Sequence, residues 1–118
     1  MSGVTHPSDL VLAVQPDRDR VIVRLVGELD LAVAGRVETT VKELVDVGFG
    51  EIVVDLRGLA FMDSAGVHML VSTTRCAEQA SCRVSGVAPP PALQRVLELT
   101  GAEPLLRFVP AETIDGAR

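Results

Sequence analysis

Two hydrophobic periodicities alternate along the chain. Short apolar runs bounded by turn residues predict buried strands, since they are too short for helices; they occupy residues 10–14, 21–26, 51–56, 82–87 and 105–109. Apolar residues spaced three and four apart predict amphipathic helices between the strands, at residues 31–47, from 64 to about 80, and after the proline run at 89–91. Arg24 interrupts the second run, which indicates that one face of that strand is partly wet.

The order of these elements indicates the fold class. Alternating strands and helices require mostly parallel pairing with right-handed crossovers, while the first two strands flank the turn at 15–19 and predict an antiparallel hairpin. We therefore expect one α/β domain with a four- to five-stranded mixed sheet and helices packed mainly on one face. The domain is expected at residues 10–110, after a flexible N-terminus at 1–9 and before a C-terminal tail at 111–118.

Composition and charge exclude several function classes. The chain has 118 residues, a net charge of −5, no Trp, no Tyr and only three Phe. An acidic chain with few aromatic residues is poorly suited to binding nucleic acid. There is no apolar run of about 18 residues and no basic segment followed by an apolar one, so we expect neither a membrane span nor a signal peptide. These features predict a cytoplasmic location.

The cysteines and histidines do not have the spacing of a metal site. Cys76 falls on the second predicted helix and Cys82 next to the following strand, and neither has a second ligand at a typical zinc spacing. We expect buried or half-buried thiols, no metal and no cofactor. His68 projects away from the apolar stripe of its helix and is expected to be a surface histidine.

The strongest local signal is the sequence Asp63-Ser64-Ala65-Gly66, where a strand passes into a helix. Ser and Asp are favoured at helix N-caps because their oxygens accept the free N–H groups of the first turn. A helix N-terminus also stabilises a phosphate. Ser64 is therefore expected at the N-cap, as either a cap or a phosphorylation switch.

Acidic residues follow two of the predicted strands. Glu28 and Asp30 come after the second strand and Asp63 after the third. If these strands are parallel, both exits open at one edge of the sheet, and the three carboxylates gather with Ser64 in one patch. A purely structural role, with Asp30 and Asp63 capping helices, is expected in any case and does not exclude a binding role.

Catalysis is not supported by the motifs. Ser64 has no histidine placed as its base except His68, one turn along the same helix, and a hydrolase would also need an orienting acid and an oxyanion hole. The chain has neither the G-x-S-x-G nucleophile elbow nor a phosphate-binding P-loop. We expect no enzyme and no catalytic residue.

Three segments carry a family resemblance: RLVGELD at 24–30, VVDLRGLAFMDSAG at 53–66 and LTGAEPLLRF at 99–108. Over about residues 10–110 the chain resembles the STAS domain family, and within it the bacterial anti-sigma factor antagonists. The resemblance implies binding to an anti-sigma factor that is also a serine kinase, which frees a sigma factor. It further implies phosphorylation of Ser64 to switch the antagonist off, and a serine phosphatase to reset it.

We also expect a partner-binding surface around the phosphorylated serine, because an acidic patch surrounds it. Its expected members are the acidic residues of the two strand exits and the first turn of the helix that follows Ser64, namely Glu28, Asp30, Asp63, Ala65, Gly66, Val67 and His68. The alternative is a non-phosphorylated STAS scaffold or a subunit of a larger regulatory or transport assembly, in which Ser64 only caps a helix.

Overall fold

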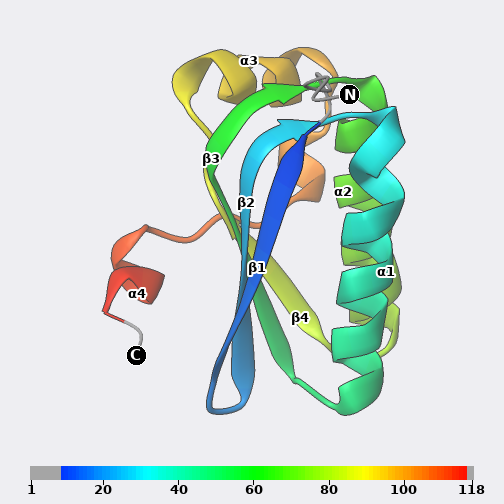
Figure 1. Cartoon of the computed structure of the whole chain (residues 1–118), viewed down its shortest axis with the longest axis vertical. Helices are drawn as coiled ribbons and strands as arrows, with labels where there is room; N and C mark the ends of the chain where they lie inside the picture. Colours follow the sequence, from blue (N-terminus) through cyan, green and yellow to red (C-terminus); the bar gives the residue numbers. More distant parts are fainter. Residues whose placement is uncertain (1–8, 117–118) are drawn as a thin grey trace, which may run out of the picture.

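The chain folds around a four-stranded mixed sheet. The computed structural model describes residues 9–116, so the predicted flexible N-terminus lies almost wholly outside the described residues. The strands run in chain order across the sheet and comprise β1 (Leu10–Asp17), β2 (Arg20–Leu29), β3 (Glu51–Met62) and β4 (Arg83–Val87). β1 and β2 are antiparallel, whereas β2, β3 and β4 are parallel (Figure 1). The predicted mixed sheet is confirmed.

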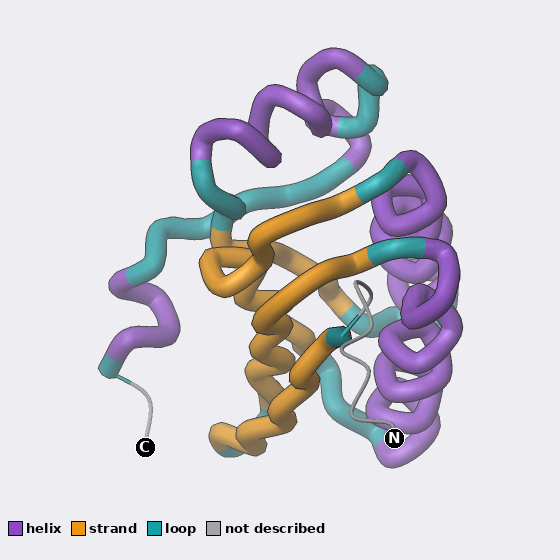
Figure 2. Tube along the Cα trace, turned by 45° about the horizontal axis from the view of Figure 1, so that its top comes forward, coloured by secondary structure: helices purple, strands orange, loops and turns teal. Residues whose placement is uncertain are grey.

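Two long helices cover one face of the sheet. α1 (Leu31–Val47) and α2 (Ser64–Gln79) lie side by side along it, and α3 (Pro91–Leu99) packs beyond the carboxyl ends of the strands (Figures 1 and 2). Alternate residues of β2 and β3 point toward these helices, as the two-residue period of a strand requires. They form the main core with the apolar stripes of the helices; its strand members include Val21, Val23, Leu25, Ile52, Val54 and Leu56.

The opposite face of the sheet is partly covered by the C-terminal segment. This segment contains a four-residue helix, α4 (Glu112–Asp115), which lies on the other side of the sheet from α1 and α2 (Figure 1). Ile114 is fully buried and packs in a second, smaller core with Ile22, Val53 and Val87. Residues 111–116, expected as part of a C-terminal tail, therefore pack on the sheet, because Ile114 fills an apolar patch that the helices leave open.

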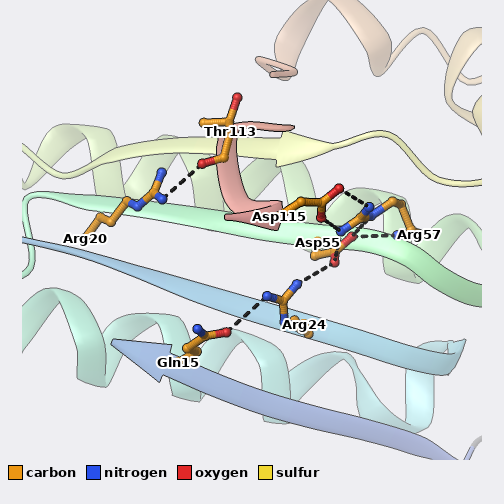
Figure 3. A network of polar contacts seen from close by, with 7 residues as sticks. All are labelled: Gln15, Arg20, Arg24, Asp55, Arg57, Thr113 and Asp115. Atoms are coloured by element: carbon orange, nitrogen blue, oxygen red, sulfur yellow. Dashed lines mark hydrogen bonds and ion pairs between the residues drawn. The ribbon is translucent and has the colours of Figure 1, made fainter. Parts of the chain in front are cut away.

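A polar network occupies the middle of this second face (Figure 3). Asp55 accepts hydrogen bonds from Arg24 Nη1 at 3.0 Å and from Arg57 Nε at 2.9 Å. Arg57 Nη2 also donates to Asp115 Oδ1 of α4 at 2.8 Å, and Arg24 Nη2 donates to Gln15 Oε1 at 3.0 Å. The sequence predicted a partly solvent-exposed strand face at Arg24, and this network lies on that face.

The last predicted strand, residues 105–109, is not formed. A 3₁₀ turn, η1 (Glu103–Leu105), begins the segment, and only an isolated parallel bridge joins Phe108 to Gly86 beside β4. Pro104 and Pro110 flank the segment, and proline has no N–H to donate to a sheet ladder. The bridge has two hydrogen bonds: the Gly86 N–H donates to the Arg107 carbonyl at 2.8 Å, and the Val109 N–H donates to the Gly86 carbonyl at 2.9 Å.

Other differences from the sequence prediction are at element ends. β3 continues six residues beyond the predicted end at 56, because Leu59 and Met62 are also buried in the main core.

Within residues 9–116, no helix combines the length and apolar character needed to cross a membrane.

Candidate functional site

Two strand–helix junctions meet at one edge of the sheet. β2 and β3 are parallel, and their last residues, Leu29 and Met62, are paired in register. The next residues, Asp30 and Asp63, begin the connections to α1 and α2. The Asp63 N–H donates to the Leu29 carbonyl at 3.2 Å, which joins the two junctions directly. The structure thus brings Asp30 and Asp63 together, as the parallel pairing predicted.

The carboxylate of Asp63 serves both helices. Its Oδ1 accepts from the Gly66 N–H at 2.9 Å, which caps α2, and its Oδ2 accepts from the Leu31 N–H at 3.3 Å, in the first turn of α1. Asp30 caps α1 alone, because its Oδ1 accepts from the Ala32 N–H at 3.0 Å. Capping by both aspartates is confirmed. The bridge to α1 was missed, since a capping motif in a sequence shows only the helix that directly follows it.

Ser64 is the first residue of α2 and not its N-cap. Asp63 has taken the capping position, so the prediction that Ser64 caps the helix was wrong. The side chain of Ser64 is exposed, and nowhere in residues 9–116 does its hydroxyl form a hydrogen bond. The hydroxyl is therefore free, and it sits at the positive end of a 16-residue helix whose first N–H groups have no intrahelical acceptor.

Gly66 allows the start of α2 to approach the end of β2. A Cβ atom at residue 66 would lie 2.6 Å from the Leu29 carbonyl oxygen and 3.0 Å from Leu29 Cγ. A side chain here would push the two junctions apart. Gly66 and the adjacent Val67 are both buried. Their side of the helix packs against the core beneath Ser64. The expectation that Gly66 and Val67 face a partner is therefore not met, because neither residue reaches the surface.

The other predicted surface residues reach solvent to different degrees. Glu28 and Ala65 are half-buried, and His68 is exposed, as predicted for it. Ser64, Ala65 and His68 line a shallow groove between α1 and α2, and Leu31 lines the opposite side. Leu31 is 77% exposed and adds an apolar side chain to this polar surface.

The carboxylates at the junctions lack cationic partners. In the described part of the chain, no arginine, lysine or histidine forms an ion pair with Glu28, Asp30 or Asp63. The charges of Asp30 and Asp63 are offset by the backbone N–H groups that they accept from and by the helix dipoles. The surface around Ser64 therefore presents negative charge to whatever approaches it.

The described residues contain no cluster of three or more His, Cys, Asp or Glu side chains able to hold a metal ion. Cys82 is buried, and burial raises the pKa of its thiol, with a smaller contribution from the charge of Glu51. Cys76 is exposed, contrary to expectation.

The fold and the junction geometry agree with a match to a known family. Residues 12–107 match the family model described as Mlab, STAS domain, so the chain belongs to the STAS domain family. A relative from Lysinibacillus sphaericus named anti-sigma F factor antagonist is 29% identical over 103 residues, covering 86% of this chain and 88% of the relative.

Solved structures support the same fold. An anti-sigma factor antagonist from Mycobacterium paratuberculosis superposes with a TM-score of 0.79 at 24% identity, covering 92% of each chain. The antagonist SpoIIAA in its unphosphorylated form gives 0.72 at 25% identity, covering 87% of this chain and 91% of SpoIIAA. SpoIIAA has also been solved in a phosphorylated form, from Bacillus, with a TM-score of 0.66, 25% identity and coverage of 87% and 95%. These relatives are regulatory binding proteins, which confirms the prediction that the chain is not an enzyme.

Proposed function

We propose that this chain is an anti-sigma factor antagonist that is switched off by phosphorylation of Ser64. The observation that carries the proposal is the free, exposed hydroxyl of Ser64 at the first position of α2, beside an aspartate that already caps the helix. The relative named anti-sigma F factor antagonist, and a related antagonist that exists in a phosphorylated form, support it.

The partners follow from this role. The unmodified chain binds an anti-sigma factor that also has serine kinase activity, and so frees a sigma factor, in the cytoplasm. A serine phosphatase resets the modified chain. The contact surface consists of Glu28, Asp30, Asp63, Ala65 and His68, and we add the exposed Leu31, which sequence reasoning missed. An apolar anchor inside an acidic rim suits a partner surface with an apolar pocket and basic edges.

Phosphorylation acts on this surface through local charge. A phosphoserine adds about −1.5 to −2 charges at neutral pH. Inside the domain, the N-terminus of α2 stabilises that charge, so the fold has little reason to change. At the contact surface, the new charge joins Asp30 and Asp63, whose carboxylates pair with no cationic side chain of residues 9–116. We expect repulsion and desolvation to lower the affinity for the anti-sigma factor about 5- to 150-fold.

The test compares two serines on the same helix. Ser64→Ala should abolish phosphate incorporation by the cognate kinase, measured as the intact mass of the protein. Ser72→Ala is the matched control: Ser72 also lies on α2, but it is half-buried and its hydroxyl donates to the Met69 carbonyl at 3.3 Å. This control should be modified like the wild type. Undiminished phosphorylation of Ser64→Ala would refute the assignment.

A second measurement separates local charge from refolding. Backbone NMR shifts caused by phosphorylation should be confined to the first turns of α2 and α1, which Asp63 joins. Shifts spread along the whole of α1 would contradict the local-charge account, and unchanged affinity for the anti-sigma factor would contradict the switch.

The alternative is a STAS subunit of a larger assembly that is never phosphorylated. In that role Ser64 was expected to cap α2, but Asp63 does so. The alternative therefore leaves the free hydroxyl of Ser64 without a function, and the kinase assay distinguishes the two.

A further inference from the structure

His68 is placed to interact with a group on Ser64. It lies four residues further along α2, which is about one helical turn, and both side chains are exposed and line the same groove. Side chains of an α-helix lean toward its N-terminus, so residues four apart lie above one another and the later one reaches back to the earlier one. This spacing puts the imidazole of His68 within reach of a group carried by Ser64.

The charges around the groove make His68 distinctive. Glu38 of α1 lines the opposite side, and Asp30 and Asp63 lie at the junctions beside it. Among the residues that line the groove, only His68 can carry a positive charge. Arg36, also on α1, is occupied elsewhere, since its Nη1 donates to the Leu10 carbonyl at 3.1 Å.

We propose that His68 is the cationic partner of phosphorylated Ser64 and makes the switch sensitive to pH near neutrality. This inference rests on the phosphorylation of Ser64 proposed above. Histidine changes its charge between about pH 5 and 8, and the second ionisation of a phosphoserine falls near pH 6. The imidazolium donates a charge-assisted hydrogen bond to a phosphoryl oxygen, which favours the dianionic phosphate.

This pairing changes what the switch does as the pH falls. While the imidazole is neutral, a dianionic phosphate on Ser64 gives the modified surface its full added charge. Once protonated, the imidazole offsets part of that charge, and the phosphate itself binds a proton near pH 6. Phosphorylation should therefore release the anti-sigma factor less completely near pH 6 than at pH 8.

The test uses protein with phosphoserine incorporated at residue 64 during translation, so that no kinase is needed. The phosphate is titrated by ³¹P NMR. His68→Gln should raise the titration midpoint of the phosphate by about half a pH unit, a threefold increase in proton affinity that is typical of an exposed ion pair. His68→Arg, which keeps a permanent positive charge, should preserve the low midpoint of the wild type.

The matched control is Arg75→Gln. Arg75 is an exposed cation on the same helix, eleven residues from Ser64, and its removal should leave the midpoint unchanged. An unchanged midpoint in His68→Gln, or an equal change in Arg75→Gln, would overturn the proposal. Failure of the kinase to modify Ser64 would instead count against the proposed function, and it would not alter this titration.

Discussion

Asp55 and Asp63 are eight residues apart on β3 and its exit, and their surroundings are opposite. The Asp55 side chain is 9% exposed and is held by Arg24 and Arg57, on the face of the sheet away from α1 and α2. Asp63 is half-buried and bonds to backbone N–H groups of two helices. One carboxylate is neutralised by side-chain cations, whereas the other keeps a net negative charge that an approaching molecule meets.

This difference in surroundings shows that an aspartate can serve stability when cations pair with it and recognition when they do not. Burial alone would raise the pKa of the Asp55 carboxyl, but hydrogen bonds from Arg57 and Arg24 and the charge of Arg57 lower it overall. The hydrogen bonds of Arg57 with Asp55 and Asp115 raise the pKa of its guanidinium in turn. The charges of Asp55, Arg24, Arg57 and Asp115 are thus paired with one another within the domain. At the junctions, no cationic side chain of residues 9–116 pairs with Asp30 or Asp63, and their charge remains available to a partner.

The largest expected effect is that of Asp55→Ala. The substitution leaves Arg24 and Arg57 without their shared acceptor, and breaking a fully buried ion pair typically costs 3–5 kcal/mol. Because both arginines reach solvent, we expect a smaller loss of about 2–3 kcal/mol in the free energy of unfolding, measured by urea denaturation. Asp55→Asn keeps the shape and serves as the control for volume. A loss below 1 kcal/mol in Asp55→Ala would show that the network is not structural.

The same network predicts a pH dependence. The folded-state pKa of Asp55 lies below its ordinary value of 3.8. Its stabilising contribution is therefore fully present above pH 3.8 and is lost as the pH falls through the folded-state pKa. The unfolding free energy of the wild type should fall in this acidic window, and that of Asp55→Asn should fall less. Parallel curves for the two proteins would contradict the assignment.

An intermediate effect is expected at the junctions. Asp30→Ala removes one cap and should cost about 1 kcal/mol, whereas Asp63→Ala removes one cap and the bond to Leu31 N and should cost up to about 2 kcal/mol. Amide hydrogen exchange at Leu31 should accelerate in Asp63→Ala. Equal losses in the two variants would show that the bond between Asp63 and α1 contributes nothing.

The smallest effect is expected for Asp115→Asn. Its pair with Arg57 is on the surface, with side-chain exposures of 52% and 39%. Exposed pairs contribute about 0–1 kcal/mol, so the urea midpoint should change little. A loss as large as that of Asp55→Ala would mean that Asp115, and not Asp55, anchors the arginine.

The fold was largely predictable because its elements have regular periods. The helix at 31–47 and the parallel pairing of β2 and β3 follow from local patterns and general topology. α4 was missed, since four residues cannot show a helical period and only the three-dimensional position of Ile114 reveals why they pack. The hydrogen bond from the Leu31 N–H to Asp63 was missed for a related reason. Its two residues are 32 positions apart, and no local pattern in either segment indicates that they meet.

The strands of the sheet lie in the same order as they occur in the chain. During synthesis, each new strand therefore meets an edge that already exists, and no strand has to be inserted between two others. The apolar face of Ile22 and Val53 has no such early cover, since Ile114 is made about 60 residues after Val53. That face consequently stays open to water, and to chaperones, until the segment that carries Ile114 has been made.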